Sequence, residues 1–294
     1  ETIQVTKPIE VLFEGLSTKI FSKNNIVKSD LTTELNAIPE KFCYLFCGHY
    51  LNGRLGEDRK DVGMLISTFL KTFLKKKERP GLILKTSGAG FSITERDSII
   101  EKINQIQEMV REETGHKGTL PSIHLINGDL TDEQMNELYS HPKVKSMVSF
   151  TKGEGFGLPL LEFASTGKPI ICSAYSGQLD FLHPNHSFLL PGKLTQIDGS
   201  AANEWLPKEG QWFSVNYQYA GQVMKDCFEN YDKYLEKSRK SSKYVKDKFS
   251  LERMTEKFEK IIDQYLENSN ENINFVENTR QPMQIKLPQL KKLT

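Results

Sequence analysis

Two glutamates, Glu154 and Glu162, stand on either side of a glycine-rich turn. The glycines leave the main chain of this turn uncovered, so its amide groups are open to a ligand. A helix predicted to begin near Pro159 adds free N–H groups and the positive end of a helix dipole. Such a turn is typical of an anion site and suits a diphosphate. The three glycines are Gly153, Gly155 and Gly157.

The two carboxylates must serve a different ligand group, because carboxylates repel phosphate. Glu162 lies roughly 6 Å along the axis of the predicted helix, about one turn from its start, and Glu154 precedes the turn. The pair therefore brackets the predicted phosphate site without entering it. Carboxylate oxygens accept hydrogen bonds strongly. The partners that fit at the two ends of a diphosphate are sugar hydroxyls, from a ribose on one side and a second sugar on the other.

The elements that must position this turn follow a simple pattern. Short apolar runs alternate with longer segments of helical character. This alternation predicts βαβ units and a parallel sheet. We therefore expect an α/β fold with a doubly wound, Rossmann-like sheet, in which ligands bind beyond the carboxyl ends of the strands. The predicted strands are 42–47, 81–86, 122–127, 145–150 and 169–173, and the glycine-rich turn follows the fourth.

Capping residues mark the expected helix ends. In the segment 94–114 apolar residues recur at helical spacing, and Thr94 is the expected N-cap. Thr131 and Gln134 have the spacing of a capping box, which predicts a second helix start. Gly167 is expected to end the helix that follows the glycine-rich turn.

We expect three parts along the chain: a linker or remnant of a preceding domain over 1–35, the Rossmann-like domain over 36–200, and helices with a tail over 201–294. The segment 206–216 is interpreted as a surface loop. Residues 216–268 have the charged, amphipathic pattern of two or three helices. The polar residues after them are interpreted as a tail that needs another surface to lie against.

The bulk composition argues against several classes of protein. A net charge of +1 gives no global field that would attract nucleic acid. No apolar run approaches the ~20 residues of a membrane-spanning helix, and the first residues lack the pattern of a signal peptide. The four cysteines lack zinc-site spacing, so we expect reduced thiols in a cytoplasmic protein.

Three segments, in the right order, resemble the C-terminal donor-binding domain of retaining GT-B glycosyltransferases of the family-four type (group 1). The segment GEGFGLPLLEFASTGKPIICSAYSGQLDFL is similar to the family's Glu-x7-Glu motif. Upstream, YLFCGHYLNGRLGEDRKDVGMLISTFLKTF resembles its first strand, phosphate loop and helix. Between them, IHLINGDLTDEQMNELYSHPKVKSMVSF resembles its nucleotide-base loop and the strand before the motif.

The resemblance implies a role for each glutamate and for the turn between them. Glu162 would bind the ribose hydroxyls of a nucleotide, and Glu154 would contact hydroxyls of the transferred sugar. Taken alone, Glu162 also suits the first turn of any helix. The main-chain amides expected to meet sugar and diphosphate are those of Gly155, Phe156, Gly157 and Leu158.

The resemblance also implies cations for the diphosphate. Arg54 and Lys60 would neutralise it and, with Glu154, form the catalytic set, while Arg59 is a rival for one of the two cationic places. Their charged stretch would equally suit a solvated loop. In the base loop, Gly128 and Leu130 would contact the nucleotide.

The implied function is transfer of a sugar, with retention of configuration, from a UDP- or GDP-linked donor to an unknown acceptor. No metal and no cofactor is expected, and an N-terminal acceptor domain would be truncated, proteolysed or supplied by another chain. Two alternatives remain: a non-catalytic nucleotide-binding module and a GT-B-fold sugar-nucleotide epimerase. A dinucleotide oxidoreductase is disfavoured, because the first turn lacks close GxGxxG spacing.

Overall fold

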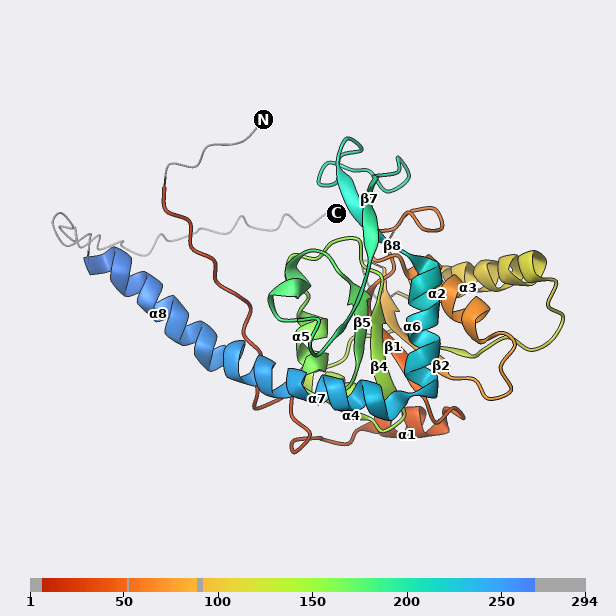
Figure 1. Cartoon of the computed structure of the whole chain (residues 1–294), viewed down its shortest axis with the longest axis horizontal. Coiled ribbons are helices and arrows are strands. Elements are labelled where there is room, and N and C mark those ends of the chain that lie inside the picture. The colour runs from red at the N-terminus through yellow and green to blue at the C-terminus, as the bar shows by residue number, and fades with distance from the viewer. Residues whose placement is uncertain (1–6, 52, 89–91, 268–294) are drawn as a thin grey trace, which may run out of the picture.

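A parallel sheet of six strands forms the centre of the molecule (Figure 1). The computed structural model describes residues 7–51, 53–88 and 92–267, so the predicted tail from residue 270 onward lies outside them. The strands are β1 (Cys43–His49), β2 (Gly81–Ser87), β3 (Ile123–Ile126), β4 (Val144–Ser149), β5 (Ile170–Ser173) and β6 (Phe188–Leu190). Their spatial order is β3-β2-β1-β4-β5-β6, and every neighbouring pair is parallel.

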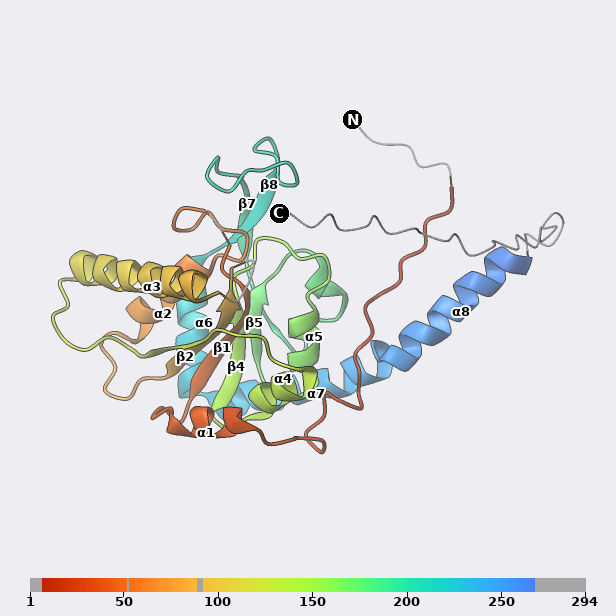
Figure 2. The ribbon, with the colours of Figure 1, turned by 180° about the vertical axis from the view of Figure 1, so that it is seen from behind.

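Helices cover both faces of the sheet (Figure 2). In β1 the side chains alternate between two apolar clusters: Tyr44 and Phe46 pack on one face, and Cys43 and Leu45 on the other. Burial on both faces explains why the strands are nearly continuous apolar runs in the sequence. The helices are α1 (Asp30–Ala37), α2 (Val62–Phe73), α3 (Ile93–Thr114), α4 (Asp132–Ser140), α5 (Leu158–Ala164), α6 (Tyr217–Glu229), α7 (Tyr231–Lys248) and α8 (Leu251–Glu267).

The strand order reverses between β1 and β4. From β1 the chain moves outward to β2 and β3, and it then returns to β4 on the other side of β1. In doubly wound sheets ligands bind in the crevice at the carboxyl ends of such a pair of strands. The glycine-rich turn follows β4, so it lies at this point.

All five predicted strands are confirmed, with small shifts at their ends. The capping box of Thr131 and Gln134 is present at the start of α4. The predicted N-cap of α3 was wrong: Ser92, not Thr94, accepts the hydrogen bond from the main chain of Glu95. A serine two residues earlier offers the same chemistry, and the sequence does not choose between them.

A two-stranded antiparallel hairpin interrupts the alternation after β6. It consists of β7 (Gly192–Gln196) and β8 (Gln211–Val215), and it projects from the carboxyl edge of the sheet (Figure 1). The interpretation of 206–216 as a surface loop was therefore wrong for 211–215, which form β8. Trp212 and Phe213 are adjacent and both buried, so β8 lacks the polar–apolar alternation by which a half-buried strand is recognised.

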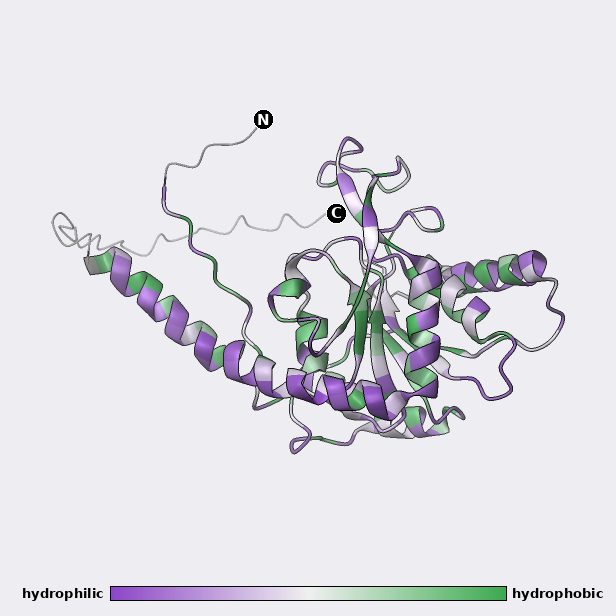
Figure 3. Cartoon of the chain, in the orientation of Figure 1, coloured by the Kyte–Doolittle hydropathy of each residue, from purple (hydrophilic) through white to green (hydrophobic). Residues whose placement is uncertain are grey.

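The chain after the hairpin forms three charged helices, as predicted. Figure 3 shows hydrophilic residues over most of the outer surface of α7 and α8, with hydrophobic positions between them. At the junction of these helices, Leu16 accepts a main-chain hydrogen bond from Leu251 and donates one to Phe249. No helix in the described residues is both long enough and apolar enough to cross a membrane.

Candidate functional site

The turn after β4 is held open by neighbouring main-chain and hydroxyl groups. The hydroxyl of Ser176 bonds to both the N–H and the C=O of Glu154, at 3.1 and 2.6 Å, and Gly157 has a left-handed φ of 97° at the start of α5. The N–H groups of the turn donate to no other described residue. Four such donors suit an anion, and α5, with seven residues, adds only a short dipole. They belong to Gly155, Phe156, Gly157 and Leu158.

Glu154 lies between two cations from the loop that follows β1. Its carboxylate pairs with the ammonium of Lys60 and lies 3.5 Å from the guanidinium of Arg59. The Glu154 and Lys60 side chains are mostly buried, at 11% and 13% exposed. Arg59 also donates to the carbonyl of Gly153 at 2.7 Å. The structure therefore brings Lys60, Arg59 and Glu154 to one point.

Arg54 occupies a different position. It is exposed, and its main-chain N–H donates to the hydroxyl of Ser200 in the loop of the hairpin at 3.1 Å. Among the described residues, no ion pair joins Arg54 to Glu154. Of the two arginines weighed from the sequence, Arg59 is the one beside the glutamate.

Glu162 lies in α5, close to β1 and α4. Its carboxylate accepts a hydrogen bond of 3.0 Å from the hydroxyl of Tyr139, which also reaches the sulfur of Cys47 at 3.8 Å. Burial raises the pKa of Glu162 to about 7, and the bond from Tyr139 only partly opposes this. The side chain is thus an acceptor whose ionisation changes near neutral pH.

The predicted base loop is pinned to β2. The ammonium of Lys85 donates to the carbonyl of Gly128 at 2.8 Å, and the amide of Asn127 donates to the carbonyl of Thr86 at 3.1 Å. Leu130 is partly buried against the apolar cluster beneath. The ring of Phe156 also packs away from the turn, 5.1 Å from the ring of Phe181, so only its main chain is available to a ligand there.

A buried ion pair of Lys152 and Asp61 lies next to the glycine-rich turn and Lys60 in the sequence. The ammonium of Lys152 is 3.5 Å from a carboxylate oxygen of Asp61, and the two side chains are 1% and 0% exposed. Tyr217 donates to the same carboxylate at 2.7 Å, while burial raises the pKa of Asp61 to about 7 against the opposing pull of Lys152. Sequence reasoning missed this pair, because nothing local in the sequence links the two positions.

Two non-glycine residues in the described part of the chain have positive φ, and both flank the site. They are Asp61 at 54° and Ser176 at 79°. Such conformations cost free energy and often occur where a functional arrangement must be held. Here they hold the start of α2 and the hydroxyl that supports Glu154.

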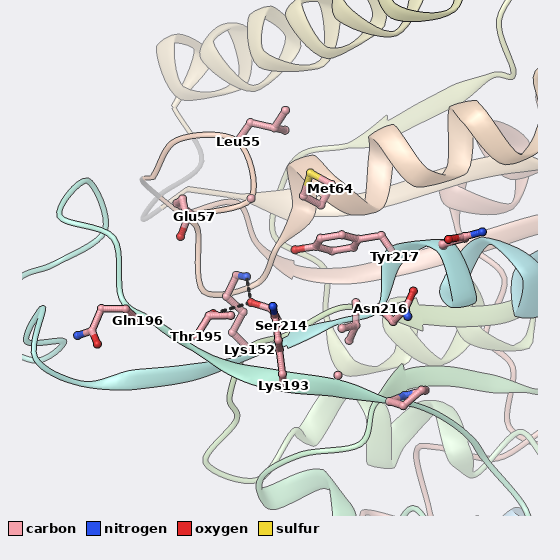
Figure 4. Close-up of a pocket in the computed structure, with 15 residues that line it drawn as sticks. Leu55, Glu57, Met64, Lys152, Lys193, Thr195, Gln196, Ser214, Asn216 and Tyr217 are labelled. Carbon is pink, nitrogen blue, oxygen red and sulfur yellow. Dashed lines mark hydrogen bonds between the residues drawn. The ribbon is translucent and has the colours of Figure 1, made fainter.

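The hairpin separates two cavities. The larger, of about 870 Å³, lies between β7, α2 and the start of α6, and is lined by neither Glu154 nor Glu162 (Figure 4). Within it Lys152, Ser214 and Thr195 form a hydrogen-bonded chain, with distances of 2.9 and 2.8 Å. The smaller, of about 490 Å³, contains Glu154 and Arg59 and reaches the other side of the hairpin.

Comparison with known proteins identifies the fold. No protein-family model and no curated protein matches the sequence. Among solved structures, the chain is similar to the C-terminal domain of a glycosyl transferase group 1 family protein (LpcC) from Francisella tularensis. The TM-score is 0.54 and the identity 14%, over 81% of this chain and 100% of that domain. The chain has the fold of a GT-B C-terminal domain.

Two longer structures extend the comparison. A glycosyltransferase from Rickettsia africae matches 87% of this chain with 56% of its own length, at a TM-score of 0.57 and 16% identity. HepE from Anabaena, solved with UDP and glucose, matches 86% with 56% of its own length, at a TM-score of 0.55 and 16% identity. The chain therefore spans just over half the length of these GT-B proteins.

Proposed function

We propose that this chain is the donor-binding half of a glycosyltransferase that moves a sugar from a nucleotide-diphosphate sugar to an acceptor, with retention of configuration. The single observation that carries the proposal is the arrangement at the reversal of strand order. Free amides of the glycine-rich turn, the Lys60–Arg59–Glu154 cluster and Glu162 lie together there. Neighbours of the same fold, including one solved with UDP and glucose, support it.

Different residues would bind different parts of the donor. The amides of the turn and Lys60 would bind the diphosphate, with Arg59 beside them. When the bond to the transferred sugar breaks, negative charge grows on the departing nucleoside diphosphate, and fixed cations stabilise that charge more than the ground state. Glu162 would accept hydrogen bonds from the ribose. Glu154, held by two cations, would accept hydrogen bonds from the transferred sugar.

Retention requires the acceptor to attack the face of the sugar from which the diphosphate leaves. We infer that the donor phosphate itself helps to deprotonate the acceptor hydroxyl, since the amides and Lys60 would hold that phosphate beside the anomeric carbon. The acceptor-binding groups would come from a separate N-terminal domain. UDP or GDP is the nucleotide we expect, and the cytoplasm is the compartment we propose.

Thermal-shift titration tests this function. The chain is titrated with UDP, GDP, ADP and their hexose conjugates, with NAD as the negative control. A ligand at 100 times its dissociation constant should stabilise the fold by about 2.7 kcal/mol. Glu162→Ala should abolish most of the shift, whereas Glu112→Ala, at an exposed position of α3, should not. No shift with any nucleotide, in a cooperatively unfolding protein, would refute the proposal.

A further inference from the structure

The smaller cavity is built jointly by the glycine-rich turn and the hairpin. Glu154 and Gly155 line one side, and Gln211, Trp212 and Leu206 line the side that belongs to the hairpin segment. The hairpin is fixed to the turn through the main chain, because Phe213 donates to the carbonyl of Lys152 at 3.0 Å. The part of the cavity wall that belongs to the hairpin is therefore attached at Lys152, two residues before Glu154 in the chain.

The cavity lies on the opposite side of the turn from Glu162. It is also lined by Tyr175 and Ser176, which follow β5. Glu162 instead contacts Tyr139 of α4, on the side of β1. A ligand whose diphosphate lies on the turn and whose ribose reaches Glu162 would thus place its other end in this cavity.

The charged groups around the cavity pair with one another. Arg59 lies 3.5 Å from Glu154, whose other oxygen is paired with Lys60. Lys152 lies 3.5 Å from Asp61. Three cations face two carboxylates, so these five residues keep a formal charge of +1 and do not exclude a charged occupant.

One neutral polar side chain in the cavity wall is available to a ligand. The amide of Gln211 is exposed and bonds to no other described residue. Beside it, the ring of Tyr175 stacks on Phe213 at 5.1 Å, and Leu206 adds apolar surface. An amide beside aromatic and apolar surface suits a hexose, which carries hydroxyls on an apolar ring.

We propose that the β7–β8 hairpin forms the outer wall of the transferred-sugar subsite, and that the side-chain amide of Gln211 hydrogen-bonds the transferred hexose. This inference rests on the proposed function, since it assumes that the diphosphate occupies the turn. It assigns the hairpin to sugar binding, and it predicts that the nucleotide part of the donor does not contact it.

Isothermal titration calorimetry of the full chain separates binding of the sugar from binding of the nucleoside diphosphate. UDP is compared with UDP-glucose, and GDP with GDP-mannose, for the wild type and Gln211→Ala. The variant should weaken the affinity for the nucleotide sugar about three- to tenfold, as expected for one lost hydrogen bond. Its affinity for the nucleoside diphosphate should be unchanged. Gln218→Ala, an identical change at an exposed position of α6 outside this cavity, should alter neither.

Each outcome has one meaning. Equal effects of Gln211→Ala on the nucleotide and its sugar, or no effect on either, would overturn the inference and leave the proposed function intact. Absence of binding by any nucleotide or nucleotide sugar would refute the proposed function, and the inference with it.

Discussion

Replacing Lys152 by methionine should destabilise the fold in a pH-dependent way. Methionine keeps most of the length of the side chain but removes the charge that faces Asp61 in a site that is 0–1% exposed. It also removes the hydrogen bond to Ser214 that ties this strand end to the hairpin. Breaking a buried ion pair by removing one partner costs about 3–5 kcal/mol. That is a large part of the roughly 5–15 kcal/mol that stabilises a typical domain.

The sign of the pH dependence follows from Asp61. Its pKa is about 7 with Lys152 present, and loss of the ammonium raises it further. Below the pKa of an unfolded aspartate, both states of the variant are protonated, and the buried carboxyl costs little. As pH rises, the unfolded state releases its proton while the folded state retains it, so stability falls until the raised pKa is passed. The penalty should therefore be larger at pH 8 than at pH 5.

Urea unfolding at both pH values measures this penalty. The double variant Lys152→Met, Asp61→Asn removes both charges and should recover about 1–2 kcal/mol at pH 8 relative to the single variant. Lys193→Met, at an exposed position of the same hairpin, is the matched control and should change stability by less than about 0.5 kcal/mol. A loss below about 1 kcal/mol at pH 8, or no recovery in the double variant, would refute the reasoning.

Two further predictions concern the site. Because the pKa of Glu162 is about 7, the affinity for a nucleotide sugar should be about tenfold higher at pH 8 than at pH 6, as measured by calorimetry. In the Glu162→Gln variant the affinity should no longer depend on pH in this range. A wild-type affinity that does not change with pH would contradict the prediction. Gly177→Ala would place a Cβ 2.1 Å from the carbonyl oxygen of Gly155, so urea unfolding should report a loss of about 1–3 kcal/mol together with weaker nucleotide binding. Gly199→Ala, where a Cβ meets nothing within 4 Å, is the control, and equal stability of the two variants would exclude the clash.

The sheet was predictable because its strands are buried on both faces. Each then forms a short apolar run between turn residues, as in the run from Cys43 to Cys47. The short β6 was missed because its three residues run directly into Pro191 and have no distinct pattern. The hairpin was missed because Trp212 packs within a small cluster of its own while Phe213 joins the main core. Adjacent residues with different packing partners produce no periodic signal.

The arrangement of the candidate site was predictable where it depends on residues close together in the sequence. It was not predictable where it depends on residues far apart in the sequence. The turn and its two glutamates lie within one strand–turn–helix unit, so their spacing is visible in the sequence. The choice between Arg54 and Arg59 depends on how the loop folds, and Arg59 is fixed because its carbonyl accepts a main-chain hydrogen bond from Lys152. The ion pair of Lys152 with Asp61 depends on the packing of β4 beside the start of α2, and no spacing rule reveals it.

The pairing of Leu16 with the junction of α7 and α8 has a mechanical consequence. Leu16 is bonded to Phe249 on one side and to Leu251 on the other, so the chain enters and leaves the α/β domain through a single joint. Gly15 lies so close to Leu251 that a Cβ there would be 2.7 Å from its Cα, so the lack of a side chain allows the two backbones to approach. A body attached at one joint can tilt as a unit while its interior stays unchanged. The segment 7–15 and α8 (Figure 1) therefore meet the domain beside the glycine-rich turn, because the ring of Phe249 at this joint lies 6.4 Å from the ring of Phe156.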